Sequence, residues 1–288
     1  MPQLNGGRKT PFHHFTVDVE ESFQASALEP YAPRTRWDSF PRRLEVGAHR
    51  LLDLLAAHDT LATFFVLGWV AERAPHLVRE ISQRGHEIAS HGSDHRRVST
   101  LTREEFRESI GSSKKALEDV TGLAVFGYRA PSFSILRGGE WALEMLLEEG
   151  YRYDSSLFPV RRRGYGFVGG GRDPYKLELS SGTLHEIPPA TLRVGSMVLP
   201  AGGGAYFRHL PYTFVQSALL SAEHRGAPGT FYVHPWELDL EQPRIRTSWV
   251  TGVRHYGGLS RTVPRLKRLL SQFRFQPIRT TLGMVDER

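Results

Sequence analysis

The sequence predicts an α/β fold built around a mostly parallel sheet. From residue 15 to about residue 160, short apolar segments typical of strands alternate with amphipathic segments typical of helices, which is the pattern of successive β-α units. The chain has 288 residues, of which 40% are hydrophobic, and this length fits one α/β barrel as well as two smaller domains. Between residues 161 and 204 glycine and proline become frequent and the alternation is lost. We therefore expect one domain with a long, irregular, β-containing insertion.

Each element expected before the insertion has a sequence pattern of its own. Residues 61–67 are apolar throughout, which is typical of a parallel strand buried on both faces. Thr102 and Glu105 form a capping box that predicts a helix starting at residue 103, with Gly122 just beyond its expected end. The expected order is strand 15–17, helix 43–58, strand 61–67, helix 71–84, strand 87–89, helix 103–120, strand 125–128, helix 140–149 and strand 151–153.

The regular pattern returns after the insertion. Residues 184–199 suggest irregular strands within the insertion, and residues 230–233 are apolar and β-prone. The expected order after the insertion is helix 211–224, strand 230–233 and helix 262–273.

The composition excludes several classes of protein. The chain contains no cysteine, so it has no disulfide framework, no cysteine metal site and no thiol nucleophile. With 11% aromatic residues it is too apolar and too aromatic for a disordered chain. We expect no transmembrane segment, because no apolar run approaches ~18 residues. The polar segment 1–10 has no apolar core of a secretory signal, so we expect a cytoplasmic location.

The formal charge of +6 has two interpretations. Arginine can simply be the preferred cation of a solvated surface, or the excess can attract a polyanion such as an acidic glycan, a lipid headgroup surface or nucleic acid. The arginines are dispersed along the sequence except at Arg161-Arg162-Arg163, and nothing resembles a nucleic-acid-binding module. We expect no nucleic-acid partner.

Two clusters of polar residues after expected strands have the composition of a metal site. Asp18 and Glu20 are two residues apart and share one face of a strand, where two like charges are unfavourable without a cation or a proton between them. Taken alone, such a pair is more often solvated. His91 and His95 have the spacing that places two imidazoles on one side of a helical turn, as metal chelation requires, although this spacing also arises by chance among 13 histidines.

Two further clusters follow the strands at 125–128 and 230–233. Arg129 can bind a carboxylate with two hydrogen bonds, and a structural salt bridge is the alternative. His234 lies beside Trp236, where burial can tune its pKa for general acid catalysis, and a hydrogen-bonded core histidine is the alternative. Because parallel α/β folds place active sites at the C-terminal ends of strands, the four clusters together predict one site.

The polar clusters, taken in order, resemble the five motifs of the polysaccharide deacetylase family, also called NodB-homology or carbohydrate esterase family 4. The matching segments are Thr16-Val17-Asp18-Val19-Glu20, His91-Gly92-Ser93-Asp94-His95, Arg129-Ala130-Pro131-Ser132-Phe133, Tyr153-Asp154-Ser155-Ser156-Leu157-Phe158-Pro159 and Phe231-Tyr232-Val233-His234-Pro235. The third motif has one extra residue before its aromatic residue. Residues 203–208, 234–239 and 254–256 resemble the branch that occurs with exosortase-linked (PEP-CTERM) exopolysaccharide clusters.

This resemblance implies a distorted (β/α) barrel. It also implies a single catalytic domain over residues 1–288, with core motifs within 14–238, the insertion at about 161–204 and a C-terminal extension over 239–288.

The resemblance also implies catalytic roles. Asp18 would be the general base, Arg129 would pair with Asp18 and keep it ionised, and His234 would protonate the departing amine. Asp154 would support or orient the His234 side.

A divalent metal is implied as the cofactor, with Glu20, His91 and His95 as its ligands. Most members of the family have a second aspartate where this chain has Val19, and Glu20 takes the place of the second acid in a D-x-D arrangement. Zinc is the first choice for such a site, with cobalt, manganese and iron as alternatives.

Four residues are expected at the substrate. Trp236 and Tyr206 can stack on sugar faces, and the backbone N–H of Phe133 or of Ser132 can stabilise an oxyanion. Arg161, with the two arginines after it, can contact an anionic glycan or a lipid-linked phosphate. The alternatives are packing for the aromatic residues and a solvated charge run for the arginines.

The leading hypothesis is a hydrolase of carbon–nitrogen bonds. It would remove N-acetyl groups from a hexosamine-containing exopolysaccharide or from its lipid-linked precursor. One alternative is hydrolysis of a small amide or a cyclic ureide. The other is a glycan-binding protein without turnover, which the replacement at Val19 suggests. No sequence pattern indicates an oligomeric state.

Overall fold

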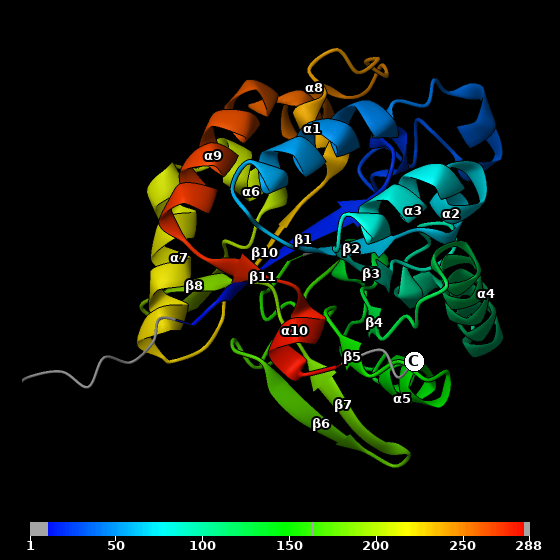
Figure 1. Cartoon of the computed structure of the whole chain (residues 1–288), viewed down its shortest axis with the longest axis vertical. Helices are drawn as coiled ribbons and strands as arrows, with labels where there is room; N and C mark the ends of the chain where they lie inside the picture. The colour runs from blue at the N-terminus through cyan, green and yellow to red at the C-terminus, as the bar shows by residue number, and fades with distance from the viewer. Residues whose placement is uncertain (1–10, 163, 285–288) are drawn as a thin grey trace, which may run out of the picture.

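The computed structural model describes residues 11–162 and 164–284 and confirms the predicted α/β class (Figure 1). Segment 1–10, used above for the expected location, and Arg163 lie outside the described residues. The strands are β1 (His13–Val19), β2 (Thr63–Val66), β3 (Glu87–Ser90), β4 (Gly127–Tyr128), β5 (Tyr153–Asp154), β6 (Tyr175–Leu179), β7 (Gly182–Glu186), β8 (Thr191–Val194), β9 (Met197–Pro200), β10 (Thr230–Val233) and β11 (Phe275–Gln276).

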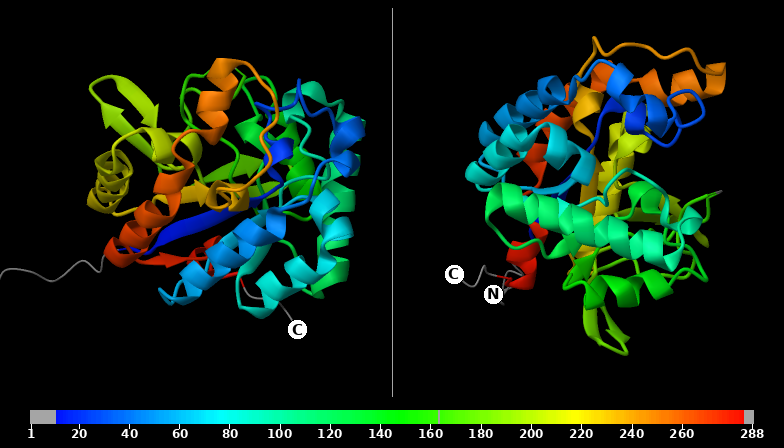
Figure 2. Two further views of the ribbon diagram at one scale, coloured as in Figure 1. Left: turned by 90° about the horizontal axis from the view of Figure 1, so that it is seen from above. Right: turned by 90° about the vertical axis from the view of Figure 1, so that its right-hand side faces the viewer.

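Helices surround the sheet, and the β6–β7 hairpin projects at one end (Figures 1 and 2). The α-helices are α1 (Leu44–Ala56), α2 (Gly68–Arg73), α3 (Pro75–Gln83), α4 (Arg103–Thr121), α5 (Trp141–Glu148), α6 (Gly204–His209), α7 (Tyr212–His224), α8 (Trp249–Tyr256), α9 (Thr262–Gln272) and α10 (Ile278–Leu282). The 3₁₀ helices are η1 (Ser22–Gln24), η2 (Arg34–Ser39), η3 (Val98–Thr100), η4 (Pro131–Phe133), η5 (Pro235–Leu238) and η6 (Leu259–Arg261).

The main sheet is a curled half-barrel with the strand order β10-β1-β2-β3-β4-β5-β7-β6, and β11 pairs with β1. Its strands run parallel except for the antiparallel pair β6 and β7, while β8 and β9 form a separate small antiparallel sheet. The chain after β7 reaches the far edge of β10, where Pro189 and Gly203 bridge to Thr230 and Tyr232. Only glycine fits at position 203, because a Cβ there would lie 1.8 Å from the Tyr232 carbonyl oxygen.

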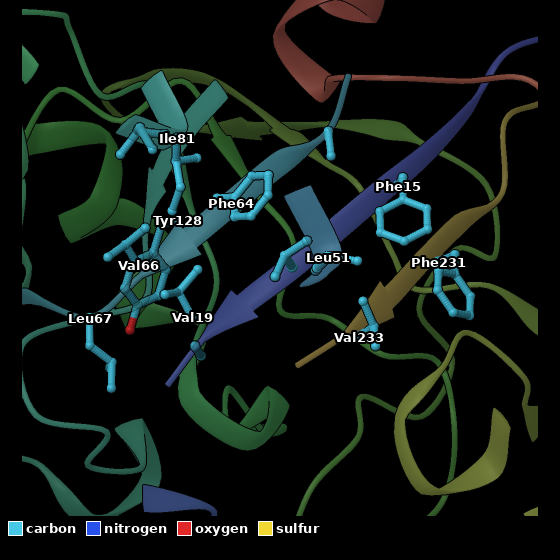
Figure 3. Packing of buried hydrophobic residues seen from close by; sticks show 14 of the residues in the cluster. Phe15, Val19, Leu51, Phe64, Val66, Leu67, Ile81, Tyr128, Phe231 and Val233 are labelled. Carbon is cyan, nitrogen blue, oxygen red and sulfur yellow. The ribbon is translucent and has the colours of Figure 1, made fainter. Parts of the chain in front are cut away.

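The two faces of the sheet differ in chemistry because side chains alternate along each strand. One face packs against α1 and the neighbouring helices through apolar side chains (Figure 3), among them Phe15, Val19, Leu51, Phe64, Val66, Phe231 and Val233. The opposite face of β1 carries Thr16 and Asp18, both buried and both in contact with Arg129. The alternation therefore directs the polar side chains of β1 toward the inside of the curl.

The structure corrects the predicted helix over 71–84, which is two helices, α2 and α3. Ala74 separates them with φ −136° and ψ 52°. Pro75 explains the break, because proline disfavours the helical conformation of the residue before it. The capping box at Thr102 and Glu105 is confirmed by both of its hydrogen bonds.

Within the part of the chain that the structure describes, none of the helices combines the length and the apolar character needed to cross a bilayer.

Candidate active site

The predicted site residues meet in a cavity of about 230 Å³ at the C-terminal ends of the strands. The cavity is formed by the segments that follow β1, β3, β4 and β10, together with parts of α6 and α8. Eight residues predicted for the site line it: Asp18, Glu20, His91, His95, Phe133, Tyr206, His234 and Trp236. The sequence clusters therefore belong to one site, as the parallel sheet requires.

Asp18 and Arg129 form the predicted ion pair. The Arg129 Nη1 atom donates to Asp18 Oδ1 at 2.7 Å and to Thr16 Oγ1 at 2.8 Å, and Nη2 donates to Ser155 Oγ at 2.8 Å. Both charged side chains are buried, so each compensates a charge that would otherwise be unpaired. Arg129 thus fixes the position of the Asp18 carboxylate and leaves Oδ2 directed at His234, whose Nε2 atom lies 3.9 Å away.

Glu20, His91 and His95 bring together three potential ligand atoms, all within 4.8 Å of one another. Glu20 Oε2 is buried and lies 2.5 Å from His95 Nε2. His91 Nδ1 lies 2.8 Å from the Arg129 carbonyl oxygen, so it donates its hydrogen there and leaves Nε2 for a cation. The three residues therefore fit a divalent metal of the nitrogen- and oxygen-binding class.

The electrostatics of these residues agree with a cation site. Burial alone would raise the pKa of Glu20, but the charges of His95, His234 and His91 outweigh it and lower that pKa. Burial lowers the pKa of His91 to about 4, so its imidazole is neutral at pH 7. A carboxylate and a neutral imidazole are the forms that bind metal.

The helical turn predicted for His91 and His95 is wrong. The segment after β3 is an irregular loop, in which His95 has φ +57° and the two rings lie 5.4 Å apart. The N–H groups of Gly68 and Trp69, at the start of α2, donate to the carbonyls of Gly92 and Ser93. These hydrogen bonds fix the conformation of the loop. The two imidazoles meet because of this anchored loop and not because of a helical spacing.

His234 is held as a protonated imidazole. Its Nδ1 atom lies 2.7 Å from Glu237 Oε1, and its Nε2 atom lies 3.8 Å from Glu20 Oε1. Burial would lower the pKa of His234, but the hydrogen bond to Glu237 and the charges of Glu20, Glu237 and Asp18 raise it to about 9. Glu237 in turn faces Arg208, with Oε2 and Nε 2.6 Å apart. His234 therefore carries a proton at neutral pH, and its Nε2 atom lies 3.9 Å from Asp18 Oδ2.

The structure does not bring Asp154 into a described contact with His234. The Asp154 carboxylate accepts hydrogen bonds from the Ser156 hydroxyl at 2.5 Å and from the Ser156 amide at 3.1 Å. Its register partner on the next strand is Glu186, and no described hydrogen bond joins it to His234. The orienting carboxylate is Glu237 instead. Its signal in the sequence was the spacing of three residues from His234, which a 3₁₀ turn brings together.

Trp236, predicted to stack on a sugar, instead contacts Glu20, His234 and His255 in this structure. Its indole Nε1 donates to Glu20 Oε1 at 3.1 Å. Its ring is stacked between His234 and His255, at 5.1 Å and 4.3 Å between centroids. Both faces of the indole are therefore covered, and the N–H fixes the Glu20 carboxylate.

Phe133 lines the cavity with its ring, which packs against Phe158 and Tyr232. Its backbone N–H is already engaged, because it donates to the Ala130 carbonyl at 2.9 Å. Of the two N–H groups expected at an oxyanion, only that of Ser132 remains a candidate. Ser132 and Phe133 both have left-handed backbone conformations, with φ of +57° and +53°.

Tyr206 lines the cavity as predicted, whereas Arg161 is exposed and does not line it. The neighbouring Arg162 is the arginine that reaches this wall, with Nε donating to the Tyr206 hydroxyl at 3.1 Å. The Tyr206 and Tyr165 hydroxyls are 2.5 Å apart. The insertion therefore contributes Tyr165 to the wall of the cavity.

Sequence reasoning missed two cations in the cavity lining, Arg97 and Arg254. Among the ion pairs of the described residues, neither guanidinium has a carboxylate partner. Arg97 Nε is buried without a hydrogen-bond partner in the described structure. Arg97 lies in no recognisable motif, and the segment 254–256 that resembles the family branch gave no role for Arg254, so only the folded structure places both at the cavity.

Comparisons with known proteins agree with this geometry. The family described as Polysaccharide deacetylase matches residues 37–144, and the domain of unknown function DUF3473 matches residues 155–283. His91, His95 and Arg129 fall in the first region and His234 in the second, while Asp18 and Glu20 precede both.

Similar proteins include the peptidoglycan deacetylase of Helicobacter pylori, 34% identical over 148 residues, which are 50% of this chain and 48% of that protein. The chitooligosaccharide deacetylase of Azorhizobium caulinodans is 34% identical over 95 residues, which are 33% of this chain and 42% of that protein. The chain thus spans about half the length of the relatives it matches.

Among solved structures, one from Mycobacterium smegmatis assigned to the polysaccharide deacetylases shares the fold with a TM-score of 0.59. It is 23% identical, and the match covers 93% of this chain and 94% of that one. The PuuE allantoinase shares the fold with a TM-score of 0.52 at 18% identity, with 90% of each chain covered. Residues 37–144 are therefore similar to the polysaccharide deacetylase family, and residues 155–283 are similar to DUF3473.

Proposed function

We propose that this chain is a metal-dependent hydrolase that removes N-acetyl groups from a hexosamine-containing saccharide. The observation that supports it is the meeting of Asp18, the Glu20-His91-His95 group and the protonated His234 in one cavity. These are the groups that amide hydrolysis needs: a base, an electrophilic centre and an acid.

The residues of the cavity divide the chemistry between them: one group would hold the metal, and two side chains move protons. A divalent ion bound by Glu20, His91 and His95 would supply a Lewis acid for the amide carbonyl and for water. Asp18, held by Arg129, accepts the proton of the attacking water. His234, held by Glu237, gives its proton to the amine, which is a poor leaving group without it. Ser132 lines the same cavity, and its N–H would donate to the developing oxyanion.

The identity of the saccharide substrate is also part of the proposal. The named relatives act on peptidoglycan and on chitooligosaccharide, which supports an N-acetylated hexosamine chain. Arg97 and Arg254 support an anionic group on that chain, such as a carboxylate or a lipid-linked phosphate. An exopolysaccharide or its lipid-linked precursor meets both conditions. The exosortase-linked branch and the cytoplasmic location are proposals that rest on the motifs and the composition.

A small amide or a cyclic ureide is the second candidate substrate. The observation in its favour is the size of the cavity, about 230 Å³, together with the wall that Tyr165 and Tyr206 form. That wall limits the length of a chain that can lie across the site.

The test is acetate release from N-acetylglucosamine oligomers, with allantoin hydrolysis measured in parallel. We expect deacetylation that a chelator abolishes and added zinc restores, and a loss of at least ~100-fold in Asp18→Asn and in His91→Ala. The matched control is His76→Ala, an exposed histidine paired with Glu45, which should keep full activity.

Full activity in Asp18→Asn or after chelation would overturn the mechanism. Turnover of allantoin without acetate release would favour the second candidate. No turnover of either substrate together with no bound zinc would favour a glycan-binding protein.

A further inference from the structure

The helix α8 presents an apolar face to solvent. Trp249, Val250 and Val253 lie on one side of the helix and are 80%, 68% and 43% exposed. Trp249 is the most exposed of the large apolar side chains in the described part of the chain, and Leu240, just before this segment, is 56% exposed. Single exposed apolar residues are common, but a contiguous group with an exposed tryptophan indicates a contact surface. We call Trp249, Val250 and Val253 the α8 face.

The positive charge of the chain is concentrated in the same region of the sequence. Residues 242–285 contain eight arginines and one lysine and neither aspartate nor glutamate. These nine cations exceed the formal charge of +6, so the rest of the chain is net negative. The expectation that the arginines are dispersed is therefore wrong for this segment. Arg244, Arg246 and Arg254 are exposed and flank the α8 face in sequence.

The α8 face lies on a helix that also contributes to the active-site cavity. Arg254 and His255 belong to the same helix and line the cavity, and His255 stacks on Trp236. In Figures 1 and 2, α8 and the segment before it (orange) lie at the outer edge of the molecule. A surface bound to the α8 face would therefore lie beside the cavity.

We propose that the α8 face binds an anionic lipid bilayer. Tryptophan and aliphatic side chains insert at the boundary between headgroups and acyl chains, where the indole ring is favoured. The flanking arginines and the absence of acidic residues from 242 to 284 match a negatively charged headgroup surface. The helix has eight residues, so it lies on the membrane and does not cross it.

The consequence for the substrate rests on the proposed function. Binding through the α8 face would bring the cavity next to the bilayer, where a lipid-linked saccharide is held. The membrane contact itself does not depend on catalysis, so the two proposals can fail separately.

The test is sedimentation of the full chain with vesicles of equal parts phosphatidylglycerol and phosphatidylcholine, and with vesicles of phosphatidylcholine alone. We expect binding to the anionic vesicles, weakened by salt, with a blue shift of tryptophan emission. The variant Trp249→Ser/Val250→Ser should bind roughly tenfold more weakly and lose the blue shift. The matched control is Val194→Ser/Met197→Ser, which removes two exposed apolar side chains from the β8–β9 sheet and should bind as the native chain does.

Equal binding to both kinds of vesicle, or unchanged binding by Trp249→Ser/Val250→Ser, would overturn the proposal. So would concentration-dependent dimerisation that this variant abolishes, because the α8 face would then be an interface between two copies. Acetate release from soluble oligomers is measured on the same samples. Its presence in Trp249→Ser/Val250→Ser shows that the site is intact, and its absence from the native chain contradicts only the proposed function.

Discussion

Two pairs of buried acidic residues lie at strand ends of this sheet, one at the end of β1 and one on β5 and β7, and their surroundings differ in charge. Asp18 lies near the end of β1 and Glu20 directly follows the strand; Arg129 pairs with Asp18, and three histidines lower the pKa of Glu20. Asp154 and Glu186 are register partners on β5 and β7 and have mainly hydroxyl and amide partners. Burial and the Asp154 charge raise the pKa of Glu186 well above its usual range.

The difference shows that burial alone does not make a catalytic carboxylate. A buried acid without a cation keeps its proton and serves the fold, whereas one supplied with cations stays ionised and can accept a proton. Glu186 illustrates the structural case, because it accepts a hydrogen bond from the Leu157 N–H and joins β7 to the chain after β5. Glu20 illustrates the other case, because three histidines lower its pKa.

Removal of the cation from the first pair should have the largest effect. Arg129→Met leaves the Asp18 carboxylate buried and unpaired, and we expect a loss of roughly 3–5 kcal/mol in the free energy of unfolding. Urea denaturation at pH 7 measures it. The double variant Asp18→Asn/Arg129→Met also removes the unpaired carboxylate, so it should recover part of the lost free energy of unfolding.

The control for this variant is Arg34→Met, which breaks an exposed ion pair with Glu29 and should change the free energy of unfolding by less than ~1 kcal/mol. If Arg129→Met is no less stable than Arg34→Met, or if the double variant recovers nothing, then Arg129 does not compensate Asp18 and the comparison fails.

The second prediction concerns the proton on His234. Because Glu237 raises the pKa of His234 to about 9, the rate of the native enzyme should fall only as the pH rises through about 9. Glu237→Gln removes the carboxylate, so the pKa of His234 falls and the loss of activity should begin ~1 pH unit lower or more. The measurement is kcat/KM against pH, with the His234 titration followed by NMR.

Glu241→Gln is the matched control, because Glu241 is exposed and should leave the pH profile unchanged. A uniform loss of activity in Glu237→Gln without a shift of the profile would mean that Glu237 only supports the fold through Arg208.

The sequence predicts the core of the fold because its signals are local. The apolar segment of β2, the capping box of α4 and the glycine after α4 each act over a few residues. The break at Pro75 had its own local signal, which the longer apolar pattern obscured. The short elements α6, α8 and β11 carry no strong pattern, since their positions depend on contacts with residues far along the chain.

The site was predictable residue by residue but not in its contacts. Motif order identifies Asp18, the histidines and Arg129. It does not show that Trp236 donates to Glu20, 216 residues away, or that Arg208 faces Glu237. Nor does the motif show that the Asp154 carboxylate bonds to Ser156, because a motif position does not give the direction of the side chain. Exposure is also a property of packing, so the α8 face could not be read from the sequence alone.

The smallest expected effect, and the one that tests the second pair, is that of Glu186→Gln. Glu186 holds its proton in the folded chain, so a neutral amide replaces a neutral acid, and stability at pH 5 should change by less than ~1 kcal/mol. A pKa raised by folding contributes stability that is present below the ordinary value of 4.5 and is lost as the pH rises toward the folded value. The native chain should therefore lose stability between pH 5 and pH 8 relative to Glu186→Gln, and urea denaturation at both pH values measures the difference.

A variant that is equally destabilised at both pH values would mean that Glu186 is ionised when buried. Arg129, whose charge also lowers the pKa of Glu186, would then compensate both acid pairs, and the distinction between a structural and a catalytic carboxylate would have to rest on access to the cavity and not on charge.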